Sequence, residues 1–112
     1  MLEEFDKHHV PLDRAFFQYG ETNQAAQLSL VKDTKSARFL VFLSNITIVY
    51  ETSVSGKLKP LGYEEVDTTV MRSECFDEAL EMFEWQYKNL LNMGLTRRSK
   101  VAGTDEVIET MQ

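Results

Sequence analysis

Residues 76–93 form one long amphipathic segment, which limits the possible folds of the chain more than any other feature does. At about 100° per residue, its apolar side chains fall within an arc of about 120°. The members of this stripe are Phe76, Ala79, Leu80, Phe83, Tyr87, Leu90 and Leu91. A stripe of that width needs an apolar surface to cover. The sequence therefore predicts a helix over 76–93 that packs on one face of a sheet.

Both ends of this segment carry signals typical of helix termini. Ser73 or Asp77 is expected to cap the start, and acidic residues in the first turns suit the positive end of the helix dipole. Gly94 stands where a residue in the left-handed conformation commonly ends a helix. The boundaries predicted from periodicity and from the caps therefore agree.

Strands are predicted upstream of the helix from the alternation of apolar and polar side chains. The segment 14–19 is a first strand or a short helix, and 26–30 alternates with the period of a half-buried strand. A polar loop over 32–36 predicts a hairpin to 37–43, which is apolar at nearly every position and is expected to be a central strand. A last strand is predicted over 63–71.

Two details of these strands bear on the candidate site. Ser44 and Asn45 interrupt the apolar run, and a tight hairpin turn is favoured there over a bulge within one long strand. In the last strand, strict alternation places Val66 on one face with its apolar neighbours. The same alternation places Glu65 and Asp67 together on the other, wet face.

These elements predict an α+β fold with an antiparallel sheet of about four to five strands and one long helix, about 76–93, on one face. The 112 residues are enough for one domain. We expect it to cover residues 13–95, with an N-terminal arm over 1–12 and a C-terminal tail over 96–112 that could begin a short helix. A single helix covers one face only, so the other face should be partly polar, covered by the arm and tail, or an interface.

Negative charge is concentrated in one stretch of the chain. The net charge is −6, yet residues 64–84 hold eight acidic residues and a single basic one, Arg72. This balance opposes nonspecific attraction to nucleic acid or anionic lipid, and it favours a partner with a basic surface. The alternative is a solvated helix face beside a polar strand.

An aromatic residue directly after this stretch predicts where a partner binds. Trp85 lies outside the apolar stripe and beside acids, as interface anchors do, unless the arm or the tail folds over it. The surface predicted to bind a protein partner consists of Glu65, Asp67, Glu78, Glu81, Met82, Glu84 and Trp85. A homodimer is a further arrangement that the sequence leaves open.

A different class of function uses the basic end of the chain. Arg97, Arg98 and Lys100 follow the helix and could contact phosphates beside aromatic residues of the sheet face, as in a regulatory nucleic-acid-binding module. Three bases after a helix also complement the helix dipole, which is the plainer interpretation.

No pattern of catalytic, metal-binding or cofactor-binding residues is present in the sequence. His8 and His9 are adjacent and point in different directions, and the glycines do not cluster into a phosphate-binding loop. Cys75 is the only cysteine and is expected to be a buried structural thiol, which fits a reducing cytoplasm. The longest apolar run, residues 39–43, is too short to span a membrane. We expect a non-enzyme without cofactor or metal.

Residues 76–80, with Phe83 and Gly94, resemble the last third of the WGR module, in which a helix closes a sheet. The Trp-Gly-Arg signature is absent, so the resemblance implies only that arrangement. In size and charge the chain is similar to small acidic proteins of phages and mobile elements, among them nucleic-acid mimics. The expected function is therefore that of a small acidic cytoplasmic protein that binds, and regulates or inhibits, a protein partner through its 64–84 surface.

Overall fold

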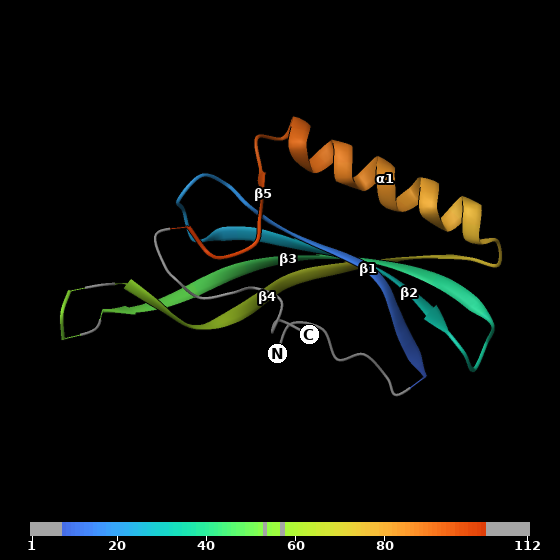
Figure 1. The fold of residues 1–112 in the computed structure, drawn as a ribbon, viewed down its shortest axis with the longest axis horizontal. Coiled ribbons are helices and arrows are strands. Elements are labelled where there is room, and N and C mark those ends of the chain that lie inside the picture. The colour runs from blue at the N-terminus through green and yellow to red at the C-terminus, as the bar shows by residue number, and fades with distance from the viewer. Residues whose placement is uncertain (1–7, 53, 57, 103–112) are drawn as a thin grey trace.

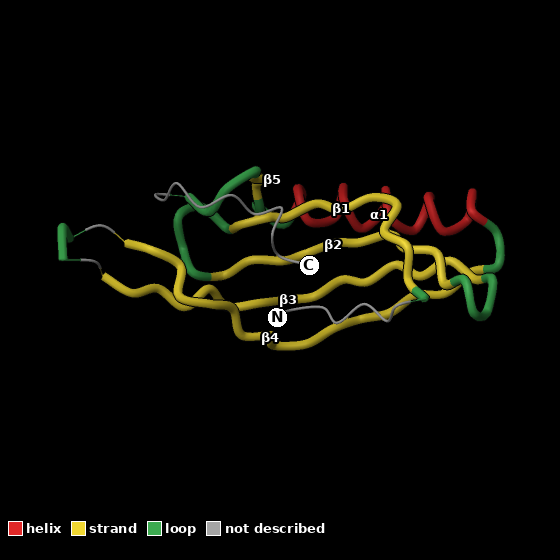
Figure 2. Tube along the Cα trace, turned by 60° about the horizontal axis from the view of Figure 1, so that its bottom comes forward, coloured by secondary structure: helices red, strands yellow, loops and turns green. Residues whose placement is uncertain are grey.

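The computed structural model describes residues 8–52, 54–56 and 58–102, and it shows the predicted α+β architecture. The strands are β1 (His9–Gln18), β2 (Gln24–Asp33), β3 (Arg38–Thr52), β4 (Leu58–Ser73) and β5 (Thr96–Arg98), and the helix is α1 (Phe76–Asn92). The strands form one antiparallel sheet in the order β4-β3-β2-β1-β5. Figure 1 shows α1 lying across one face of this sheet, and Figure 2 shows the strand order.

The main core lies between α1 and the sheet. Its buried residues come from β1, β2, β3 and α1, namely Ala15, Phe17, Ala26, Leu28, Leu30, Val41, Ala79, Phe83 and Leu90. The ring of Tyr87 packs edge-on against that of Phe17, with 5.0 Å between the centroids. This apolar layer is the surface that the helical stripe was predicted to cover.

The helix termini agree with the sequence at one end and differ at the other. Gly94 has a φ of 88°, and its N–H donates to the carbonyl of Leu91. Both features are typical of a helix that ends at a residue in the left-handed conformation. The N-cap is Cys75, with no side-chain cap, so the expected cap from Ser73 or Asp77 is wrong. The hydroxyl of Ser73 instead accepts a hydrogen bond from the Cys75 N–H at 3.1 Å.

The predicted hairpin turn at Ser44 and Asn45 is wrong, because β3 is one strand of 15 residues that includes this pair. The amide of Asn45 donates to the carboxylate of Asp67 at 2.8 Å, and the hydroxyls of Ser44 and Thr68 lie 3.2 Å apart. Both polar side chains therefore bond across to β4 and stabilise the ladder instead of a turn.

The arm and the tail are shorter than expected. Four residues assigned to the arm, 9–12, belong to β1, and residues 96–98 of the expected tail form β5 beside the end of β1. Val101 then packs with Phe16 on the sheet face opposite α1. The predicted short helix after residue 103 and the start of the arm, 1–7, lie outside the described residues.

Candidate functional site

The acidic residues of β4 do not share a face, contrary to the prediction. Asp67 pairs with Asn45 and Glu65 pairs with Ile46, so Val66 is an extra, unpaired residue of β4. Successive residues of β3 point to opposite faces, and cross-strand partners share a face. Asp67 is therefore on the α1 side of the sheet and Glu65 on the opposite side. The bulge at Val66 is the physical reason, because an extra residue shifts the alternation by one.

Bulges of this kind mark both edges of the sheet. The pairing also skips Leu61 in β4 and Leu12 in β1. All three skipped residues are apolar and exposed. Bulges twist a strand edge and discourage its pairing with another chain. The exposed side chains of Leu12, Leu61 and Val66 thus have a local structural explanation and do not by themselves indicate a binding site.

The outer face of α1, defined here by Glu78, Glu81, Glu84 and Trp85, keeps the predicted combination of acids and an aromatic. All four side chains are exposed, and 64% of the surface of Trp85 is accessible. Glu81 precedes Trp85 by one helical turn and Glu78 by two, so they lie on the same side of α1. Trp85 is therefore not part of the core between α1 and the sheet, whereas residues 1–7 and 103–112 of the arm and tail, which could cover it, lie outside the described residues.

Met82, which was assigned to the predicted binding surface, is less exposed than the other members of that surface on α1. It is half-buried and packs against the cluster between α1 and the sheet. On the opposite flank of the helix, Leu91 is 45% exposed although it was assigned to the buried stripe. The helix is thus turned about its axis toward Met82 relative to the prediction. Gln86 agrees with this orientation, because its side-chain nitrogen lies 3.7 Å from the sulfur of Met71 in β4.

Two of the three bases proposed to contact nucleic acid have partners within the fold. The guanidinium of Arg97 lies 5.7 Å from the centroid of the Tyr87 ring, and Arg98 donates to the carbonyl of Gly20 at 3.1 Å. Lys100 is exposed. Arg97 and Arg98 therefore act in holding β5 beside α1 and the β1–β2 turn.

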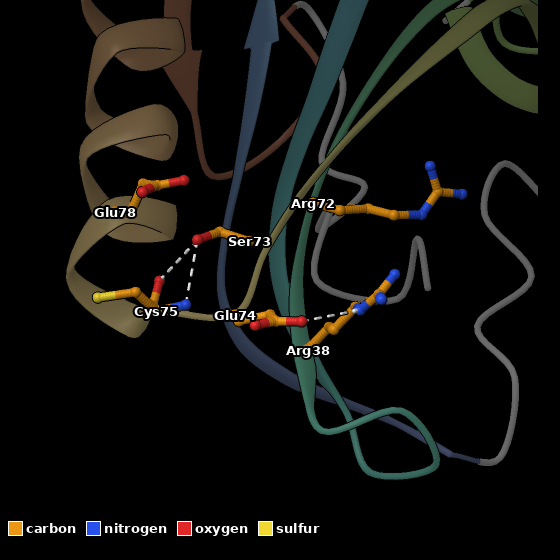
Figure 3. Close-up of a pocket in the computed structure, with 6 residues that line it drawn as sticks. All are labelled: Arg38, Arg72, Ser73, Glu74, Cys75 and Glu78. Atoms are coloured by element: carbon orange, nitrogen blue, oxygen red, sulfur yellow. Dashed lines mark hydrogen bonds and ion pairs between the residues drawn. The ribbon is translucent and has the colours of Figure 1, made fainter.

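A basic pair that the sequence analysis missed lies at the far end of the sheet. Arg38 begins β3 and Arg72 ends β4, and both line two hollows of about 390 and 360 Å³. Figure 3 shows both side chains extending away from α1. Arg72 was counted only as the single base among eight acids. Its proximity to Arg38 follows from the β3–β4 register, which the sequence pattern did not give.

The described residues bear on the predictions made for metal binding and for the cysteine. They contain no group of three or more histidine, cysteine or acidic side chains that could hold a metal ion. Cys75 is exposed at the start of α1, so the expectation of a buried thiol is wrong. The pKa of Asp33 is lowered, chiefly because the hydroxyl of Ser36 donates to its carboxylate at 2.9 Å. That carboxylate organises the β2–β3 turn.

Comparison with known proteins adds no family to these observations. No family model, curated protein or solved structure gives a significant match to the chain. Over the part of the chain that the structure describes, no helix is both long and apolar enough to cross a membrane.

Proposed function

We propose that this is a non-catalytic interaction protein that binds a basic protein partner through the outer face of α1. The proposed surface is smaller than the one expected from the sequence, because Met82 is half-buried against the core and Glu65 and Asp67 lie on opposite faces of the sheet. Binding would regulate or inhibit the partner, and the lone cysteine keeps the cytoplasm as the proposed compartment.

The exposure of Trp85 is the observation that carries this proposal. A tryptophan that is 64% exposed leaves a large aromatic surface in water, and burying such a side chain commonly supplies a large share of binding energy. The core of the protein does not need this residue, because Ala79, Phe83 and Leu90 already fill the contact with the sheet. The position of Trp85 is therefore free to serve a partner.

The surrounding carboxylates indicate the chemistry of that partner. Glu78, Glu81 and Glu84 are exposed on the same outer face of α1. Such a single-sign patch speeds encounter with a basic surface and repels an acidic one. A symmetric homodimer through this face would bring the same carboxylates of two copies together, which favours a basic partner over a second copy.

The alternative function, a nucleic-acid-binding module built on the sheet and the basic tail, receives less support. Arg97 and Arg98 already have partners in the fold, and Phe39 packs against the core under α1. The net charge of −6 also opposes binding to phosphates.

The proposal is tested by affinity capture from the native host followed by kinetic measurements with the purified partner. Trp85→Ala is expected to speed dissociation about 30-fold, which corresponds to roughly 2 kcal/mol for a central aromatic anchor. Reversing Glu78, Glu81 and Glu84 to lysine is expected to slow association about tenfold or more at low salt and to remove its salt dependence.

Matched controls come from the same chain. Leu91→Ala shortens another exposed apolar residue of α1, and Glu65→Lys with Asp67→Lys reverses charges on β4. Both controls should leave the two rate constants within about twofold of the wild-type values, because surface residues outside an interface contribute little. If Trp85→Ala and the lysine variant also retain wild-type rates, this face does not bind the partner.

A further inference from the structure

The end of the sheet near the β2–β3 turn holds a second, chemically opposite surface, centred on Arg38 and Arg72. Arg72 pairs with Leu40 in the sheet register, and Arg38 lies two residues before Leu40. Residues two apart in a strand point to the same face. Both guanidinium groups therefore start from the sheet face opposite α1, and Figure 3 shows them extending to the same side.

The two arginines form a wall shared by two adjoining hollows. The first, of about 390 Å³, is also lined by Ser73, Glu74, Cys75 and Glu78. The second, of about 360 Å³, has Leu40, Phe42 and Val70 among its lining residues, together with His9 and the β2–β3 turn. The first hollow therefore contains two carboxylates, whereas the second contains one, that of Asp33, beside basic groups and apolar side chains.

The positive charge of this pair is poorly balanced by the described residues. Arg38 has one ion pair, to Glu74, at 3.8 Å, and the two side chains are 50% and 83% exposed, so this contact contributes little. Arg72 forms no ion pair with any described residue. Among the described residues, the positive charge of Arg72 is therefore unpaired and that of Arg38 is paired only weakly.

The carboxylate closest in the sheet register does not supply that counter-charge. Asp33 lies opposite Arg38, but its oxygens accept hydrogen bonds from the N–H of Lys35 at 3.0 Å and from the hydroxyl of Ser36 at 2.9 Å. The carboxylate is thus held by the turn. Among the described residues, Asp33 is therefore the one carboxylate that lines the second hollow, and it forms no ion pair with either arginine.

We infer that Arg38 and Arg72 form a binding site for a phosphate monoester, with the apolar side chains of the second hollow receiving the group that carries the phosphate. Guanidinium groups match oxyanions through paired N–H donors. A phosphate monoester carries a charge of about −1.5 to −2 near neutral pH, so it balances the charge of two arginines better than a carboxylate would. Glu78 of the outer face of α1 is among the lining residues of the first hollow and not of the second, which receives the ligand.

The test is a titration of the full-length, ¹⁵N-labelled protein with inorganic phosphate and, separately, with phenyl phosphate, at constant ionic strength set by chloride. Phosphate is expected to shift the side-chain Nε–H signals of Arg38 and Arg72 with saturation, with millimolar affinity. Phenyl phosphate should bind several-fold more tightly, because its ring covers the apolar lining of the second hollow. Equal affinities would overturn the role given to that lining.

Substitutions separate this site from general charge effects. Arg72→Gln and Arg38→Gln are each expected to weaken phosphate binding at least tenfold, whereas Lys59→Gln, which removes the same charge at the other end of β4, should not. Trp85→Ala should leave the titration unchanged, so failure here is distinguishable from failure of the proposed protein-binding face. Equal loss in Lys59→Gln, or no saturable shift in the wild type, would overturn the inference.

Discussion

The two faces of the sheet use the same strands but differ in chemistry. Toward α1, the core cluster is apolar, as Phe17, Leu28 and Val41 show. On the opposite face, the buried residues include Gln27, Ser29 and Ser44 alongside apolar ones. One face is thus a packing surface with a dedicated cover. The other retains polar groups within the sheet, and it ends at the two arginines.

The residues that stabilise the fold are therefore largely different from the residues proposed to bind other molecules. Burial of apolar area between α1 and the sheet is the dominant favourable term for folding. The outer face of α1 and the pair of Arg38 and Arg72 contribute little to that core. Charge and aromatic surface can therefore accumulate in those two places without a large cost in stability.

The largest expected effect tests which side of α1 packs against the sheet. Phe83→Ala should lower the free energy of unfolding by about 3–5 kcal/mol, because Phe83 is buried in the core. Leu91→Ala should lower it by less than about 1 kcal/mol, because Leu91 is largely solvated. Urea unfolding followed by circular dichroism measures both. Similar losses for the two variants would contradict the orientation of the helix.

The features predicted correctly from the sequence are those fixed by local periodicity. The helix was expected over 76–93 and spans Phe76–Asn92, because the apolar repeat and Gly94 act within a few turns. The hairpin loop over 32–36 was likewise found, between β2 and β3. The α+β class followed from combining these local elements.

The features that the sequence did not reveal depend on pairing between distant segments. Ser44 and Asn45 resemble a turn locally, yet they bond to Thr68 and Asp67 across the sheet. The split of Glu65 from Asp67 arises from a single unpaired residue in β4, which strict alternation cannot show. The candidate site changed for the same reason, because only the register brings Arg38 and Arg72 to one face.

A smaller effect distinguishes two buried serines on the polar face. The hydroxyl of Ser29 is buried and has no hydrogen-bond partner among the described residues, whereas that of Ser44 lies 3.2 Å from the hydroxyl of Thr68. Ser29→Ala should therefore raise the free energy of unfolding by about 1 kcal/mol, because it removes an unsatisfied polar group. Ser44→Ala should lower it by about 1 kcal/mol, because it leaves Thr68 with one partner fewer.

Urea unfolding of these two variants sharpens the comparison between the faces. Changes of opposite sign in the free energy of unfolding would show that this face contains both satisfied and unsatisfied hydroxyl groups. A loss of stability in Ser29→Ala equal to that in Ser44→Ala would mean that the Ser29 hydroxyl is bonded in solution. The description of the polar face would then have to change at that position.

The smallest expected effect concerns the turn where the polar face ends. The hydroxyl of Ser36 donates to the carboxylate of Asp33 and lowers its pKa, with further help from the Lys35 N–H. A carboxyl group whose pKa is lower in the folded state stabilises the fold at pH values above its unfolded pKa, and this contribution disappears as the pH falls through the folded value. Wild-type protein should therefore lose a small part of its stability below about pH 4.

Asp33→Asn should be less stable than the wild type at pH 7, and its stability should decline less over that acidic range. Urea unfolding at pH 7, 5 and 3 measures the difference. Asp13→Asn is a control, since among the described residues the carboxylate of Asp13 accepts a hydrogen bond only from the adjacent Arg14 N–H. Parallel pH profiles for wild type and Asp33→Asn would show that the turn does not depend on this carboxylate.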